Sequence, residues 1–254
     1  MDSSSAITET STQSKEKQAP LYQEEEQQRG KISTVNPATE EIISQYEIMV
    51  KDQINERVKK AQKTFEEWKK DLNKRIDYLH DLASELRKNK ENLARTATKE
   101  MGKVIKESRS EVEKCAWVVE YYADNGPIFM KEKVINTDAR KSLIAFQSIG
   151  VIGSIMSWNF PYWQAIRFAS PSLILGNTVI LKPASATMQC GIEIEKSFNK
   201  IGAPEGVFQT LVGDSTIAEA LIDSADISAI TDSADISAIT FTTMDKRKKK
   251  RGHK

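Results

Sequence analysis

Residues 149–184 read IGVIGSIMSWNFPYWQAIRFASPSLILGNTVILKPA, and this stretch decides the fold. An apolar segment, a Trp-Asn-Phe-Pro turn, an apolar helical run and a second apolar segment follow one another without a polar gap. This order predicts strand, loop, helix and strand, which is the unit of a parallel α/β sheet. Ligands bind outside the carboxyl ends of such strands. We therefore expect Trp158, Asn159 and Lys182 at a ligand-binding edge.

The chain on either side continues the α/β alternation. Residues 142–147 (SLIAFQ) are strand-like, and a helix over 187–200 follows the second strand of the central stretch. A third parallel strand is predicted over 207–212, ending at Gly213, and a further helix over 215–222. This βαβαβ order indicates a nucleotide-binding half-sheet.

Three amphipathic helices are predicted before the sheet. Apolar residues recur at spacings of three and four, as in the stripe of Ile54, Val58 and Trp68. The glycine and proline after the third helix, within Asn125-Gly126-Pro127, are expected to end it. The predicted elements are a short hairpin over 31–49 around an Asn-Pro turn, and helices over about 54–68, 73–99 and 104–124.

Both ends of the chain differ in composition from the middle. Residues 1–30 are rich in Ser, Thr, Gln and Glu, which predicts a disordered N-terminal arm. Residues 223–231 (DSADISAIT) are repeated without change in 232–240, and one copy is enough to form the next strand. The other copy must loop out or compete for the same position. Residues 243–254 form a basic tail.

Composition limits the classes of protein that are compatible with this chain. Its 254 residues are 39% hydrophobic and 29% charged, which allows one large or two small domains. Two cysteines provide no disulfide framework, two histidines provide no histidine-rich metal site, and no apolar run reaches the roughly 18 residues that span a bilayer. We expect a cytoplasmic protein without a metal or a membrane partner.

Several motifs resemble those of one family. SWNFP at 157–161, Arg167, GNTVILKPAS at 176–185 and NPATEE at 36–41 are similar to motifs of the aldehyde dehydrogenase superfamily, nearest to its succinate-semialdehyde dehydrogenase branch. The resemblance covers about Ser33 to Thr242, with a disturbance after Leu221. It implies an α/β fold of N-terminal helices plus an incomplete Rossmann-type parallel sheet. Residues 31–242 would form part of the NAD(P)-binding domain, with the catalytic domain absent.

The resemblance also implies a cofactor, NAD or NADP. Lys182 matches the lysine that hydrogen-bonds the adenine ribose, and Gly213 matches a glycine that lets the backbone approach the cofactor. Ser185 replaces a glutamate of many members, which removes repulsion toward a 2′-phosphate. Structural interpretations remain open: Lys182 as a lysine that extends from the strand end to solvent, and Gly213 as a simple turn. No GxGxxG or Walker A sequence is present.

Five further residues are implied to serve the substrate or the channel. Asn159 matches the amide that stabilises the oxyanion, although it could instead cap a helix before Pro161. Arg167 would bind the substrate carboxylate, or form a buried structural ion pair. The apolar residues that would line the cofactor or aldehyde channel, or else belong to the core, are Ile155, Met156 and Trp158.

The sequence offers no obvious nucleophile. Cys115 and Cys190 both lie in helical patterns without a nearby histidine and are predicted to be packed thiols. We therefore expect a truncated family member without turnover of its own. The alternative is a non-catalytic nucleotide-binding or assembly partner of full-length relatives. The basic tail has no interleaved aromatic residue, so we favour a truncated or frameshifted terminus over a nucleic-acid site.

Overall fold

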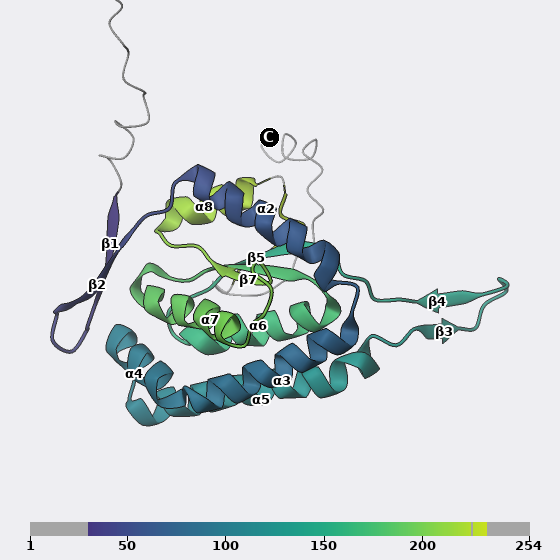
Figure 1. Cartoon of the computed structure of the whole chain (residues 1–254), viewed down its shortest axis with the longest axis horizontal. Helices are drawn as coiled ribbons and strands as arrows, with labels where there is room; N and C mark the ends of the chain where they lie inside the picture. The colour runs from purple at the N-terminus through teal and green to yellow at the C-terminus, as the bar shows by residue number, and fades with distance from the viewer. Residues whose placement is uncertain (1–29, 225, 233–254) are drawn as a thin grey trace, which may run out of the picture.

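The computed structural model describes residues 30–224 and 226–232, and it contains the predicted parallel sheet. Neighbouring strands pair in parallel in the order β7-β6-β5-β8 (Figure 1). β6 forms within the second apolar segment of residues 149–184, where a strand is predicted, whereas β7 is shorter than the predicted 207–212. The four strands are β5 (Val151–Ile155), β6 (Thr178–Lys182), β7 (Phe208–Thr210) and β8 (Ala229–Asp232).

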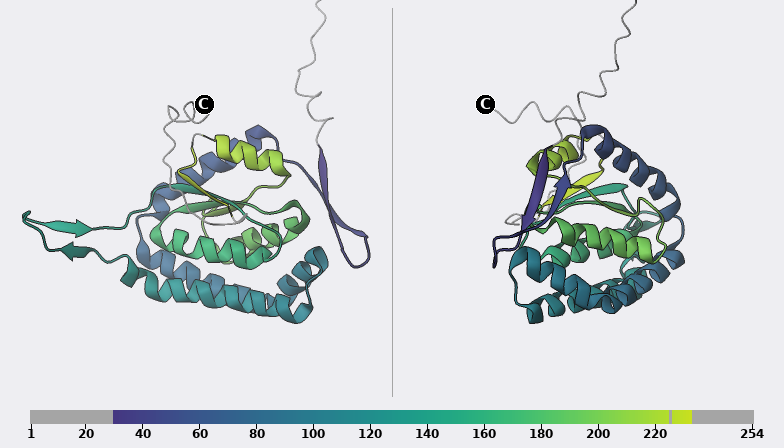
Figure 2. Two further views of the ribbon diagram at one scale, coloured as in Figure 1. Left: turned by 180° about the vertical axis from the view of Figure 1, so that it is seen from behind. Right: turned by 60° about the vertical axis from the view of Figure 1, so that its left-hand side comes forward.

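Helices cover both faces of this sheet (Figures 1 and 2). One face is covered by α6 (Pro161–Leu175) and α7 (Met188–Lys200), and the other by α2 (Lys51–Trp68) and α8 (Ser215–Asp223). An outer layer packs on α6 and α7 and consists of α3 (Leu72–Lys88), α4 (Lys90–Met101) and α5 (Ile105–Phe129). The sheet is therefore enclosed between helical layers. Because its strands are parallel, the loops that follow β5, β6 and β7 all leave from its carboxyl edge.

Side chains of β6 divide between two hydrophobic cores. Val179 and Leu181 belong to the larger core, which the outer helical layer shares with α6 and α7. Ile180, between them, belongs to a smaller core with Ile54 and Val58 of α2. This alternation is the period of two that a strand imposes on its side chains. It explains why a strand buried on both faces is a continuous apolar run.

An arginine from α3 holds the C-terminal end of α6. Arg75 is 5% exposed and donates from Nε to Ile174 O at 3.0 Å and from Nη1 to Trp68 O at 2.9 Å. Burial lowers the pKa of Arg75, an effect opposed by the charge of Asp71. The guanidinium satisfies backbone carbonyl groups that a helix end leaves without intrahelical partners. A buried structural arginine therefore exists, but it is not the predicted Arg167.

The predicted helix over 73–99 is wrong as a single element. The chain turns at Asn89, which ends α3 and begins α4 with φ −95° and ψ 9°. Backbone bonds Asn89 N to Glu85 O and Leu93 N to Asn89 O keep the change local. Because apolar residues keep their helical spacing across the break, periodicity alone does not reveal it. Asparagine has a low helix propensity, which suits this position.

The predicted stop at Asn125-Gly126-Pro127 is also wrong. α5 continues to Phe129, and Met130 N donates to Gly126 O at 3.0 Å. Gly126 is buried where α5 crosses α6, and a Cβ on it would lie 2.5 Å from Ile174 Cγ1. The glycine therefore allows two helices to approach closely. Tertiary packing overrides the local preference of these residues for a turn.

Two antiparallel hairpins accompany the main body. The predicted one is formed by β1 (Lys31–Val35) and β2 (Ile42–Glu47). The other pairs β3 (Lys133–Ile135) with β4 (Ser142–Ile144) and projects from the body (Figures 1 and 2). Only part of the strand-like 142–147 is therefore a strand, and it pairs outside the parallel sheet. Val134 is 75% exposed.

Several predicted segments lie outside the described residues. These are the N-terminal arm up to residue 29, nearly all of the second copy of the repeat, and the basic tail. β8 contains the last three residues of the first copy and Asp232, so the first copy supplies most of the strand next to β5. Within the part of the chain that the structure describes, no helix has the length and apolar character needed to cross a bilayer.

Candidate functional site

Two predicted site residues follow neighbouring strands at the carboxyl edge of the sheet. Ile155 at the end of β5 pairs in register with Lys182 at the end of β6. Met156 N then donates to Lys182 O at 3.1 Å. The turn that carries Asn159 and the residue Lys182 therefore leave the same edge of the sheet, as the sequence predicts for a ligand site.

Lys182 is a buried cation without a close counter-charge. It is 6% exposed, and no carboxylate of the described residues lies within 4 Å of its Nζ. Burial lowers the pKa of Lys182, and the charge of Asp214 opposes this shift. A lysine that extends to solvent would not be desolvated, so that interpretation is wrong. An ammonium group in this position is suited to bind a ligand hydroxyl or anion.

Ser185 and Gly213 meet beside this lysine. Ser185 Oγ donates to Gly213 O at 3.3 Å and so links the β6–α7 and β7–α8 connections. Gly213 has φ +154°, and a Cβ on it would overlap Ile217 of α8. A glycine is therefore required, and this position is more than a simple turn.

Asp214, which we did not predict, completes this group. Its Oδ1 accepts from Thr216 N at 2.9 Å and caps α8, and the hydroxyl and amide of Thr216 lower the pKa of Asp214. The pattern of an aspartate directly before a helix could have indicated this cap.

Asn159 presents its amide group to solvent. Its Oδ1 accepts from Ser157 Oγ at 2.7 Å, and its Nδ2 has no hydrogen-bond partner among the described residues. The N-cap of α6 is Phe160, which provides no side-chain hydrogen bond. The interpretation of Asn159 as a helix cap is therefore wrong. Its amide nitrogen is free to donate to a ligand oxygen.

Glu111 of α5 supplies the missing cap of α6. The backbone N–H groups of Tyr162 and Trp163 both donate to Glu111 Oε1 at 2.9 Å. The other oxygen, Oε2, forms an ion pair with Lys103 Nζ, and both side chains are less than 5% exposed. Lys103 Nζ also lies 4.2 Å from the ring centroid of Phe160.

A cavity of about 860 Å³ lies beside the Asn159 turn. Phe160, Trp163 and Gln164 contribute to it from α6, and Lys114 contributes from α5. Lys114 Nζ lies 4.0 Å from the ring centroid of Trp163. This cavity is large enough for a small organic substrate, and its cation and amide groups suit a polar one.

Arg167 lies on α6, one turn after Trp163. It is exposed, and its Nη2 donates to Gln164 Oε1 at 3.3 Å. No ion pair of Arg167 forms within the described residues, so a buried structural ion pair is wrong. The guanidinium remains available to a ligand.

The three apolar residues predicted for a channel have different environments. Met156 is buried in the larger core, and Ile155 is half-buried against the smaller one. Trp158 is 57% exposed, so its assignment to the core is wrong. A role of these residues in lining a channel stays a prediction.

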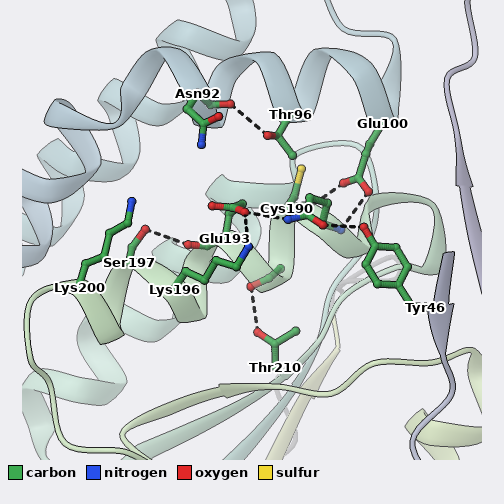
Figure 3. A network of polar contacts seen from close by, with 12 residues as sticks. Tyr46, Asn92, Thr96, Glu100, Cys190, Glu193, Lys196, Ser197, Lys200 and Thr210 are labelled. Atoms are coloured by element: carbon green, nitrogen blue, oxygen red, sulfur yellow. Dashed lines mark hydrogen bonds and ion pairs between the residues drawn. The ribbon is translucent and has the colours of Figure 1, made fainter. Parts of the chain in front are cut away.

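A second buried glutamate caps the next helix. Glu100 of α4 is 3% exposed and accepts from Gln189 N at 2.9 Å and from Cys190 N at 3.0 Å (Figure 3). Tyr46 Oη donates to Gln189 Oε1 at 2.6 Å beside it. Burial raises the pKa of Glu100, and the two backbone amides oppose this shift.

Protein carboxylates therefore occupy the N-termini of α6, α7 and α8 at the carboxyl edge. In many nucleotide-binding folds a phosphate binds to such a helix end. The described residues provide no group of three or more His, Cys, Asp or Glu side chains that could hold a metal ion.

Comparison with known proteins decides the family. Residues 22–242 match the model of the aldehyde dehydrogenase family. The chain belongs to this family. It is 39% identical to a probable succinate-semialdehyde dehydrogenase [NADP(+)] of Synechocystis over 194 residues. That match covers 76% of this chain and 43% of the Synechocystis protein. A succinate semialdehyde dehydrogenase [NAD(P)+] of Escherichia coli is 33% identical over 195 residues, 76% of this chain and 42% of that protein.

Solved structures confirm the aldehyde dehydrogenase fold. The succinic semialdehyde dehydrogenase of Streptococcus pyogenes, in complex with NADP+, is 29% identical with a TM-score of 0.76, covering 79% of this chain and 45% of that chain. The structure of Gox0499 is 28% identical with a TM-score of 0.77, and the match covers 80% of this chain and 45% of Gox0499. The chain thus spans less than half the length of the relatives that it matches.

Both thiols of this aldehyde dehydrogenase chain are packed, as predicted. Cys115 and Cys190 are 0% exposed. Burial raises the pKa of both thiols well above the ordinary value. A catalytic cysteine requires an accessible thiolate, so neither residue has the environment of a nucleophile.

Proposed function

We propose that these residues supply the cofactor-binding and oxyanion-stabilising part of an NAD(P)-dependent aldehyde dehydrogenase. The observation that carries this proposal is the buried, unpaired Lys182 at the same sheet edge as the free amide of Asn159. Membership of the family and the names of the relatives support an aldehyde with a carboxylate tail, such as succinate semialdehyde, as the substrate.

The residues around Lys182 fit a dinucleotide. The ammonium group would donate to the ribose hydroxyls, and Gly213 would let the backbone approach the adenosine half. Ser185 carries no charge, so a 2′-phosphate meets no repulsion there and NADP+ is accepted. The nicotinamide, when bound, supplies the hydride acceptor for oxidation of the aldehyde.

The residues around Asn159 fit the aldehyde. Attack of a thiolate on an aldehyde places negative charge on oxygen, and the Asn159 amide would donate to that oxygen. Arg167, exposed on the same helix, would bind the substrate carboxylate. Because both cysteines are buried, we propose that neither attacks the aldehyde and that the 254 residues alone do not turn over.

Titration of the purified chain with NADP+ and NAD+ by calorimetry tests the cofactor site. We expect saturable binding that Lys182→Met weakens about tenfold or more, because a charge-assisted hydrogen bond is lost. Lys60→Met, which removes an exposed lysine of α2, is the control and should bind normally. Equal affinity of the wild type and Lys182→Met contradicts the proposal, as does formation of NADPH from succinate semialdehyde.

A second candidate function is assembly with full-length relatives. The β3–β4 hairpin exposes Val134, Leu143 and Ile144 far from the packed body. An exposed apolar surface of this kind favours association with another chain.

Co-purification with the Escherichia coli relative tests this function. The double variant Val134→Glu, Ile144→Glu should abolish association, and Arg140→Glu in the hairpin loop should not. Association that survives the double variant excludes the hairpin as the docking element.

A further inference from the structure

Beneath the Asn159 turn lies the most deeply buried ion pair of the described residues. Lys103 precedes α5, Glu111 lies on α5, and their side chains are 4% and 3% exposed. Charges are rarely buried to this degree unless each has partners. The contacts of this pair converge on the residues that directly follow Asn159.

Both oxygens of Glu111 are used in this arrangement. Oε1 accepts the N–H groups of Tyr162 and Trp163, and Oε2 binds Lys103. Lys103 in turn lies against the ring of Phe160. The pair therefore contacts three of the four residues after Asn159, and it reaches them across 51 positions of sequence.

Few hydrogen bonds of its own fix the side chain of Asn159. Its one hydrogen bond within the described residues goes to Ser157, two positions away in the same turn. The N-cap residue Phe160 contributes no side-chain hydrogen bond. A local Ser or Asp cap would stabilise α6 but would not tie the turn to α5. The remote pair ties the residues after Asn159 to α5.

We propose that Glu111 and Lys103 are positioning residues that hold the Asn159 amide in the direction required of an oxyanion donor. This inference rests on the proposed function of Asn159. Preorganised donors stabilise developing charge because they need no reorientation during the reaction. The pair thus acts on the residues after Asn159, through the backbone N–H groups of Tyr162 and Trp163 and the ring of Phe160.

Glu100 provides a matched control within the same chain. It is also a buried glutamate that accepts two backbone N–H groups at a helix N-terminus, but on α7. Glu111→Gln and Glu100→Gln therefore each remove a buried carboxylate from a helix cap. Only the first of these caps follows Asn159.

Amide hydrogen exchange and the side-chain NH₂ signals of Asn159, measured by NMR on the full chain, test the proposal. Asn159→Asp identifies those signals by their loss. We expect Glu111→Gln to accelerate exchange at Tyr162 and Trp163 by about tenfold and to shift or broaden the Asn159 signals. Glu100→Gln should accelerate exchange at Gln189 and Cys190 and leave the Asn159 signals in place.

A second variant covers the case in which Glu111→Gln does not fold. Phe160→Leu removes the ring beside Lys103 while leaving the ion pair intact, and it should also shift the Asn159 signals. Unchanged Asn159 signals in the folded variants overturn the proposal, as do equal shifts in Glu100→Gln. NADP+ binding by the wild type, measured in parallel, tests the proposed function separately. If the wild type does not bind NADP+, the NMR experiment still shows whether Glu111 and Lys103 position Asn159.

Discussion

The N-termini of α6 and α7 carry out the same structural task with different charge balance. Each receives a buried glutamate from the outer helical layer, and each glutamate accepts two backbone N–H groups. Glu111 at α6 is paired with Lys103, whereas Glu100 at α7 has no cation partner among the described residues. The α6 cap includes an ion pair, and the α7 cap has no cation partner among the described residues.

This difference shows how burial and a neighbouring cation together affect the charge of a capping carboxylate. A helix N-terminus stabilises a nearby negative charge, but desolvation of a carboxylate opposes it. Where Lys103 is present, the charge is compensated inside the protein. Where a cation is missing, burial raises the pKa of Glu100.

The largest effect is expected from Lys103→Met, because it leaves the Glu111 charge buried without its partner. We expect a loss of about 3–5 kcal/mol in the free energy of unfolding, measured by urea denaturation. The double variant Lys103→Met, Glu111→Gln should recover part of this loss, with a coupling free energy of about 1–3 kcal/mol. Additive effects of the two changes would contradict a direct ion pair.

The opposite end of α6 gives the next largest effect. Arg75→Met leaves the carbonyl groups of Ile174 and Trp68 without their donor and should cost about 3 kcal/mol of unfolding free energy. Arg167→Met, on the exposed side of the same helix, is the control and should change it by less than about 0.5 kcal/mol. A large loss for Arg167→Met would restore the structural interpretation of that residue.

Glu100→Gln should cost about 1–3 kcal/mol, because an amide satisfies only one of the two backbone donors. Burial raises the folded-state pKa of Glu100 above its ordinary 4.5, so the folded state retains the proton to higher pH than the unfolded state. The stability that the Glu100 proton contributes is complete below pH 4.5, and it is lost as the pH rises through the folded-state pKa of Glu100. Unfolding measured from acid to neutral pH should therefore show the wild-type advantage over Glu100→Gln shrinking. A growing advantage would refute the assignment.

The smallest change is expected at Lys182, the buried cation that has no carboxylate partner. Burial lowers its folded-state pKa below the ordinary 10.5, so its charged form costs stability at neutral pH and this cost disappears as pH rises past 10.5. Lys182→Met should therefore raise the melting temperature at pH 7, with the gain vanishing at high pH. A lower melting temperature at pH 7 would show that the ammonium group stabilises the unliganded fold.

Local patterns predicted much of this fold. The bounds of β6 follow from an apolar run between Asn177 and Pro183, and the stripe of α2 follows from a spacing of three and four. The assignment of Lys182, Ser185 and Gly213 to one cofactor site came from the resemblance to the family. Glu100 and Glu111 were missed, because on a helix a charged residue looks like surface until its partner is known.

The sequence alone determined the α/β order, the hairpin at the start and the edge of the sheet at which Asn159 and Lys182 lie, because short-range periodicity and turn residues encode them. Tertiary structure decided that α5 continues through Pro127, that Arg75 and not Arg167 is the buried arginine, and that Glu111 caps α6. Each depends on contacts between residues far apart in sequence, where burial and close packing outweigh local preference.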